Sequence, residues 1–115
     1  YVVCRPTVRE AEEYHHHYAV ECADTGAVER LMNLQGLHAQ SFPQDMFDAL
    51  RTRFAAGHGV YPLIGDPDTV ADEIARIHAA GFAGATLAFV DYAGELPYFA
   101  QEVLPRLAAR GLRSL

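Results

Sequence analysis

The sequence predicts an α/β fold in which short parallel strands alternate with helices. Residues 61–110 read as strand, helix, strand and helix, and a second apolar stretch, Tyr1–Cys4, precedes another helical pattern. The run Ala85–Val90 (ATLAFV) is continuously apolar, which is typical of a strand buried on both faces of a parallel sheet. The chain therefore contains three strand-then-helix units, and we expect their crossovers to be right-handed.

The first unit begins with a predicted strand at Tyr1–Cys4. Thr7 and Glu10 have the spacing of a capping box, so a helix is expected from about Val8. We expect that helix to continue without interruption to about residue 23, with one apolar stripe facing the core. The expected stripe consists of Ala11, Tyr14, Tyr18 and Cys22.

A helical insertion, Gly26–Gly59, precedes the second strand. Asp24 or Thr25 is expected to cap a short helix that ends before residue 36. Ser41 and Gln44 repeat the capping-box spacing and predict a third helix that ends near residue 56. The apolar face of this third helix is expected to contain Met46, Phe47, Leu50 and Phe54.

The second and third units occupy the rest of the chain. The second strand is predicted at Tyr61–Ile64, followed by Asp66 as N-cap and Pro67 at the first helical position. Gly81 has the position of a left-handed C-cap for this helix. The third unit is the strand at residues 85–90 and a helix at Leu96–Arg110, in which we expect a proline at position 105 to cause a kink.

Composition narrows the class of protein. The chain has 115 residues, half of them hydrophobic, which suffices for one core, and a net charge of −6 with no visible basic face, so we expect no nucleic-acid partner. No apolar run approaches the roughly 18 residues of a membrane span. Cys4 and Cys22 form no metal or disulfide pattern, which favours a cytoplasmic location.

The ends of the predicted sheet suggest that the chain is part of something larger. It begins without Met inside an apolar strand, so we expect a piece of a longer protein. Three parallel strands would leave both sheet edges open. Either further strands complete the sheet, or the chain pairs with a second copy as a homo-oligomer.

Two motifs have residue types found in ligand sites, but we expect both to be structural. Consecutive side chains on a helix point about 100° apart, so the run His15–His17 is not expected to converge on a metal ion, and no metal is predicted. Gly65, Asp66 and Pro67 open a helix, where free N–H groups attract anions. Asp66 would itself cap those groups, so a structural cap is favoured.

Two other motifs contain residues that are candidates for a functional site. Gly57 and Gly59 flank His58 in a tight turn, with Tyr61 close behind, and either a plain turn or a presented imidazole fits this pattern. Asp91 and Tyr92 directly follow the apolar run, and active-site groups gather at the carboxyl ends of barrel strands.

The segment from Pro62 to Leu107 resembles the C-terminal end of the bacterial-luciferase-like flavin monooxygenases, including the alkanesulfonate monooxygenases and pyrimidine oxygenases. The opening stretch YVVCRPTVREAEEY is similar to the family pattern VxxRDTxxEA of a sixth barrel strand and helix. The matching residues are Gly65, Asp66, Pro67, Val70, Ala71, Ala80, Gly81, Phe89, Val90, Asp91, Tyr92, Glu102, Leu104, Pro105 and Leu107.

The resemblance implies a partial (β/α)8 TIM barrel, the last three βα units with a helical insertion, spanning residues 1–115. It implies an enzyme that oxygenates a small organic substrate with O2 and reduced FMN supplied by a flavin reductase. Tyr92 and His58 would then be catalytic, and Gly57, Gly59, Tyr61 and Asp91 would belong to the substrate site or lid.

The sequence also departs from the family. Tyr1 replaces an active-site histidine of some relatives, and the lid arginine of the sulfonate enzymes is replaced near Ala56, with Arg53 close by. We expect the flavin-phosphate contacts to lie upstream, so this chain alone would bind no FMN tightly and be inactive. The alternatives are a non-catalytic self-association module and a deazaflavin-dependent oxidoreductase of the same superfamily.

Overall fold

The computed structural model describes residues 1–114 and divides into two compact units. The α/β unit consists of Tyr1–Glu13 and the chain from Leu63 onward, and the helical unit consists of Tyr14–Pro62. In the described residues, no helix has the length and apolar character required to cross a membrane.

Two short parallel strands form the sheet of the α/β unit. β1 (Val2–Cys4) pairs with β2 (Leu63–Gly65). The Leu63 N–H donates to the Tyr1 carbonyl at 2.8 Å, and the Arg5 N–H donates to the Gly65 carbonyl at 3.1 Å. The α/β class is therefore confirmed, with most of the described chain in helices.

The predicted third strand, Ala85–Val90, is wrong as a strand, because these residues have no regular secondary structure. Leu87 and Phe89 are half-buried against the core, whereas the other four residues of the run are exposed. Burial on both faces is therefore wrong as well, since the described residues cover only one side of this segment.

A single hydrogen bond defines the position of this segment beside the sheet. The Val2 N–H donates to the Ala88 carbonyl at 2.9 Å. Backbone groups of alternate residues point to opposite edges of a strand, and Tyr1 and Arg5 bond to β2. β1 therefore lies between β2 and Ala88. A barrel whose strands follow in chain order would have this segment beside β2 instead.

The helices of the α/β unit begin largely where the capping signals predict. In α1 (Val8–His16), the Glu10 N–H donates to Thr7 Oγ1 at 3.2 Å. In α4 (Pro67–Ala79), the Thr69 N–H donates to Asp66 Oδ1 at 2.8 Å, and Gly81 follows the helix with φ of 102°. The predicted caps of both helices are confirmed.

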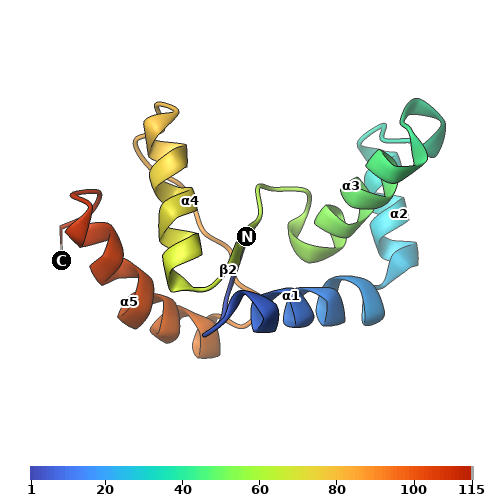
Figure 1. Ribbon diagram of the computed structural model, residues 1–115. Helices are drawn as coiled ribbons and strands as arrows, with labels where there is room; N and C mark the ends of the chain where they lie inside the picture. Colours follow the sequence, from blue (N-terminus) through green and yellow to red (C-terminus); the bar gives the residue numbers. More distant parts are fainter. Residues whose placement is uncertain (115) are drawn as a thin grey trace. The chain divides into compact units, whose positions relative to one another are not determined.

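Helix α5 (Tyr92–Ala109) begins four residues before the predicted start and continues through Pro105. It packs against α4 (Figure 1). Helix α4 packs against both strands, and the apolar faces of α4 and α5 form one core with them. The buried core residues are Val2, Cys4, Leu63, Val70, Ala71, Phe99, Val103 and Leu107.

The predicted insertion, Gly26–Gly59, is helical and lies within the helical unit. It contains α2 (Thr25–Leu34), a 3-10 turn η2 (Ala39–Ser41) and α3 (Gln44–Gly57). The Ala27 N–H donates to Asp24 Oδ1 at 3.0 Å, so Asp24 is the cap of α2. The buried residues of this core are Met32, Phe47 and Phe54.

Three predictions for this region are wrong, and the first is the place of Met46 on the apolar face of α3, because its side chain is 54% exposed. Ser41 does not cap α3, because it belongs to η2, and α3 begins after Pro43 without a side-chain cap. The helix that begins at Val8 does not continue regularly to residue 23, because a π-helical turn, η1 (His17–Glu21), replaces its last part. The wider turn shifts the phase of the stripe, so that Ala19 is buried and Cys22 is exposed.

Candidate functional site

A cleft of about 390 Å³, named the polar cleft here after the charged side chains of Arg5, Asp91 and Glu95 on its wall, lies at the carboxyl end of β1 in the α/β unit. Parallel strands and the N-termini of the following helices converge at such ends, which is where α/β proteins place ligand sites. The residues that line the cleft are Cys4, Arg5, Pro6, Asp91, Gly94, Glu95 and Tyr98.

An ion pair between Arg5 and Glu95 is the central feature of the cleft. Arg5 Nη2 lies 2.6 Å from Glu95 Oε1, and the side chains are 23% and 10% exposed. Arg5 Nη1 also donates to the Cys4 carbonyl at 2.9 Å. The second carboxylate oxygen of Glu95 accepts from the Asp91 N–H at 3.0 Å. The guanidinium charge is thus balanced within the chain, and the pair holds the start of α5 to the end of β1.

Asp91, a predicted site residue, is the N-cap of α5. Its Oδ1 accepts hydrogen bonds from the Ala93 and Gly94 N–H groups, both at 3.1 Å. Early N–H groups of a helix have no partner within the helix, so this cap explains an aspartate at position 91. It also explains the early start of α5, because a cap at residue 91 places Tyr92 in the first turn.

Two titratable side chains beside Arg5 are held in their neutral forms. Burial raises the pKa of the Cys4 thiol to about 11, with smaller opposing effects from charges that include Arg5. Burial also raises the pKa of the Tyr98 hydroxyl. A neutral thiol is a poor nucleophile, so Cys4 is not suited to attack a substrate in this cleft.

Tyr92 lies on the wall of a different, mostly apolar groove of about 560 Å³ in the same unit. Its side chain is 54% exposed, and its ring packs edge-on against Phe89 with centroids 5.5 Å apart. Phe89 packs in the same manner against Phe99, also at 5.5 Å. The apolar side chains lining the groove include Ile74, Leu87, Leu96, Leu104, Leu107 and Leu112.

The other predicted site residues belong to the helical unit, at the end of α3. His58 is the C-cap in a left-handed conformation with φ of 58°, and its N–H donates to the Phe54 carbonyl at 3.0 Å. Gly59 follows with φ of 81°. Gly57 is the last residue of α3, and Tyr61 is 54% exposed. These residues form a helix-ending turn that presents an aromatic side chain to solvent.

Arg53 supports this turn. Its Nη2 approaches the carbonyl oxygens of Gly59 and Val60 at 3.4 and 3.5 Å. Two marginal hydrogen bonds of this length hold the turn weakly. The six predicted site residues are thus divided between the units, with Asp91 and Tyr92 in one and the remaining four in the other.

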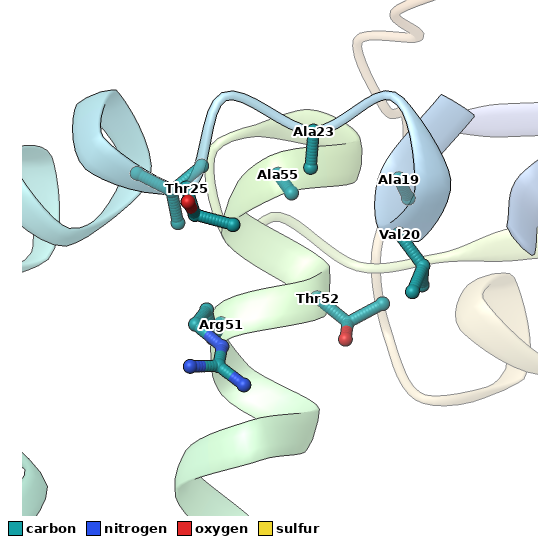
Figure 2. Close-up of a pocket in the computed structure, with 8 residues that line it drawn as sticks. Ala19, Val20, Ala23, Thr25, Arg51, Thr52 and Ala55 are labelled. Atoms are coloured by element: carbon teal, nitrogen blue, oxygen red, sulfur yellow. The ribbon is translucent and has the colours of Figure 1, made fainter. Parts of the chain in front are cut away.

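A small pocket of about 160 Å³ lies in the helical unit between η1, α2 and α3. Figure 2 shows Val20 near Thr52 on one side and Thr25 on another, with Arg51 extending from α3. Arg51 pairs with Asp48 at 3.0 Å and approaches Glu29 at 3.9 Å. Alkyl groups dominate the lining, and the guanidinium is neutralised, so the pocket lacks groups for catalysis.

The three consecutive histidines, His15–His17, differ in environment. His15 packs edge-on against Tyr18 at 5.7 Å, and burial followed by the charge of His16 lowers its pKa. His16 and His17 are exposed and approach Glu21 at 3.8 and 2.8 Å. Among residues 1–114, no group of three or more His, Cys, Asp or Glu side chains has an arrangement suited to a metal ion.

Sequence reasoning missed Arg5 and Glu95. Arg5 directly follows a predicted strand, and Glu95 lies four residues after the predicted site residue Asp91, so each had a local signal. No sequence pattern indicated that these two residues, 90 positions apart, would form an ion pair. Comparisons with protein-family models, with curated proteins and with solved structures found no match for this chain.

Proposed function

We propose that this chain is the C-terminal part of a luciferase-like, FMN-dependent monooxygenase, forming the last three βα units of a (β/α)8 barrel. The intact enzyme would use reduced FMN from a separate flavin reductase to oxygenate a small organic substrate with O2. The observation that carries the proposal is the motif run from Gly65 to Tyr92, continued by ELPYF. The isolated chain is proposed to be inactive.

The local structure supports the proposal by giving the motif residues physical roles. Asp66 caps α4 and Pro67 occupies its first turn, while Asp91 caps α5. Both caps lie directly after the stretches that would be barrel strands. A βα unit needs a helix that starts promptly after its strand, so the motif has the residues that such a unit requires.

The residues of this chain do not fit the FMN phosphate. Helix N-termini bind phosphates through free N–H groups, but Asp66 and Asp91 already accept hydrogen bonds from those groups in α4 and α5. The Arg5 guanidinium is balanced by Glu95. We therefore propose that the contacts to the FMN phosphate come from residues outside this chain.

Tyr92 and His58 remain the proposed catalytic residues. Tyr92 lines an apolar groove with two phenylalanines, where an exposed hydroxyl is available to donate a hydrogen bond to a reacting group. His58 lies between two glycines in a turn of the proposed lid. In the intact enzyme, Tyr92→Phe should lower the rate about a hundredfold while leaving flavin affinity unchanged.

The strand order in this chain differs from the order expected in a barrel. In a barrel, residues 85–90 would pair with β2, whereas here Ala88 bonds to Val2 of β1. We propose that upstream strands of the intact barrel displace this bond. Amide hydrogen exchange of the intact protein would then show residues 86–90 protected, as expected for a paired strand.

The function is tested with the protein expressed from the whole reading frame. The protein, a flavin reductase, NADH and FMN are incubated with candidate organic substrates under isotopically labelled dioxygen. Incorporation of one labelled oxygen atom into a product supports the proposal. If the reading frame upstream of Tyr1 lacked the five preceding βα units, the family assignment would be overturned.

A second candidate is a self-association module without catalysis. It is favoured by exposed apolar side chains along residues 82–90 of the α/β unit, where Phe82 is 62% and Val90 is 52% exposed. Such surfaces drive association when a complementary edge is present. Sedimentation velocity should then show dimers, and a monomer at high concentration would contradict this candidate.

The third candidate is a deazaflavin-dependent hydride-transfer enzyme of the same superfamily. It differs from the monooxygenase in needing neither FMN nor incorporation of dioxygen. Turnover of the intact protein with a reduced deazaflavin, and none with reduced FMN, would favour it over the first proposal.

A further inference from the structure

We propose that Cys22 is a reactive thiol, activated by His17 and Glu21, that forms mixed disulfides with small-molecule disulfides. The three side chains lie on one exposed turn of the helical unit, outside the polar cleft and the apolar groove. None of them takes part in the function proposed above, so the two proposals are independent and are tested separately.

The π-helical turn brings the thiol to the imidazole. The Cys22 N–H donates to the His17 carbonyl at 3.0 Å, a bond between residues five apart that an α-helix does not make. Cys22 Sγ consequently lies 3.6 Å from His17 Nε2 and 4.0 Å from Nδ1. In a regular α-helix, residues five apart do not face each other, so this contact depends on the π turn.

The carboxylate of Glu21 orients the imidazole. Glu21 Oε2 lies 2.8 Å from His17 Nδ1, and this hydrogen bond is the main reason that the pKa of Glu21 is lowered. An ionised carboxylate at Nδ1 favours the tautomer whose Nε2 is free to accept a proton. His16 also approaches Glu21, at 3.8 Å, but its contact is with the other carboxylate oxygen.

These contacts supply the three parts of an activated nucleophile, namely a thiol, a base and a group that orients the base. The thiolate is the reactive form, so the exposed Cys22 side chain first rotates from the face of the ring toward the Nε2 lone pair, its S–H bond breaks and His17 Nε2 takes the proton. The thiolate attacks one sulfur of the disulfide, a new S–S bond forms, and the old S–S bond breaks. Cys22 is oxidised, the leaving sulfur is reduced, and the proton passes to the leaving thiolate.

Cys4 provides an internal control in the same chain. It is 5% exposed in the core of the α/β unit, and its pKa is raised to about 11. Cleavage after arginine, with the Arg5–Pro6 bond resistant, separates the two thiols into the peptides Tyr1–Arg9 and Glu10–Arg30. Both thiols are therefore followed in one experiment by mass spectrometry.

The test measures the rate of mixed-disulfide formation with glutathione disulfide at neutral pH. We expect Cys22 to react on the order of a hundredfold faster than Cys4, because reactivity requires exposure and thiolate character. His17→Gln should slow Cys22 on the order of tenfold, and Glu21→Gln should slow it less. Both side chains are more than half exposed, so these substitutions leave the fold intact.

His16→Gln is the matched control, since it removes a neighbouring imidazole that does not contact the thiol. It should change the rate less than about twofold. An unchanged Cys22 rate in His17→Gln would overturn the proposal. A Cys22 rate equal to that of the urea-unfolded chain would also overturn it, because the folded turn would then contribute nothing.

Discussion

The two compact units are assembled from different kinds of contact. The core of the helical unit joins helices from one continuous stretch, with Met32, Phe47 and Phe54 as its buried residues. The α/β unit pairs β1 with β2 across about sixty residues, and its charged pair links Arg5 to Glu95 across 90. Local patterns therefore specify the first unit closely, whereas the second depends on pairings that no local pattern records.

The largest expected effect is in the core of the α/β unit. Phe99 is 3% exposed and packs against Phe89, so Phe99→Ala should lower the free energy of unfolding by about 3–4 kcal/mol. The measurement is urea denaturation followed by circular dichroism. Leu96→Ala, on the same helix but 46% exposed, should cost less than about 1 kcal/mol. Equal costs for the two variants would contradict the assigned core.

The ion pair of the polar cleft should contribute more than an ion pair on the surface. Arg5→Gln leaves the nearly buried Glu95 carboxylate without its charged partner and should destabilise the chain by about 2.5 kcal/mol. The exposed pair of Arg9 and Glu13, at 3.5 Å, is the control. Arg9→Gln should cost less than about 0.5 kcal/mol by the same denaturation measurement. A small cost for both would mean that the long-range pair does not hold α5 to β1.

In the helical unit, two glycines allow a matched comparison. Both have a left-handed φ, of 81° at Gly59 and 75° at Gly36. A Cβ at Gly59 would lie 2.6 Å from Phe54 Cε2, whereas a Cβ at Gly36 would meet nothing within 4 Å. Gly36→Ala should cost about 1 kcal/mol and Gly59→Ala about 2 kcal/mol. Equal thermal stability of the two variants would show that the turn after α3 does not pack on Phe54.

The smallest expected effect is the pH dependence of the α4 cap. The hydrogen bond from the Thr69 N–H lowers the pKa of Asp66 below its ordinary value of 3.8. Its stabilisation is thus fully present above about pH 4 and is lost as pH falls through the lowered pKa. Asp66→Asn should keep most of the cap but lose this part of the pH dependence, while Asp66→Ala should cost about 1 kcal/mol at neutral pH. Parallel acid-unfolding curves for wild type and Asp66→Asn would contradict this assignment.

The caps and turns were predictable because their physics is local. Thr7, Asp24 and Asp66 each bond to a backbone N–H three residues away, and the capping pattern states this spacing directly. The same pattern gave a wrong prediction at Ser41. The ring of Pro43 fixes φ at the start of α3, and the helix begins there without a side-chain cap.

The third predicted strand and the π turn could not be derived in the same way. Whether residues 85–90 are covered on both faces depends on which strands lie beside them, and apolarity alone does not say which. The phase shift at His17 depends on a bond between residues five apart, which regular helical periodicity excludes. For the same reason, the contact between His17 and Cys22 was missed.

The two motifs that contain the candidate site residues belong to different units. Asp91 and Tyr92 were identified from their place after an apolar run, and the structure explains Asp91 as a cap. Tyr92 lines the groove of the α/β unit, while His58 ends a helix of the helical unit. Residue pattern identified the positions, but the chemistry assigned to them rests on the family resemblance.

Anaerobic equilibrium binding of reduced FMN tests the central proposal most directly. The protein from the whole reading frame and the 115-residue chain are titrated in parallel. The account predicts saturable binding by the whole protein and none by the chain, because Asp66 and Asp91 occupy the helix N-termini that would otherwise take the phosphate. Absence of binding by the whole protein, or equal affinity of the isolated chain, would contradict it.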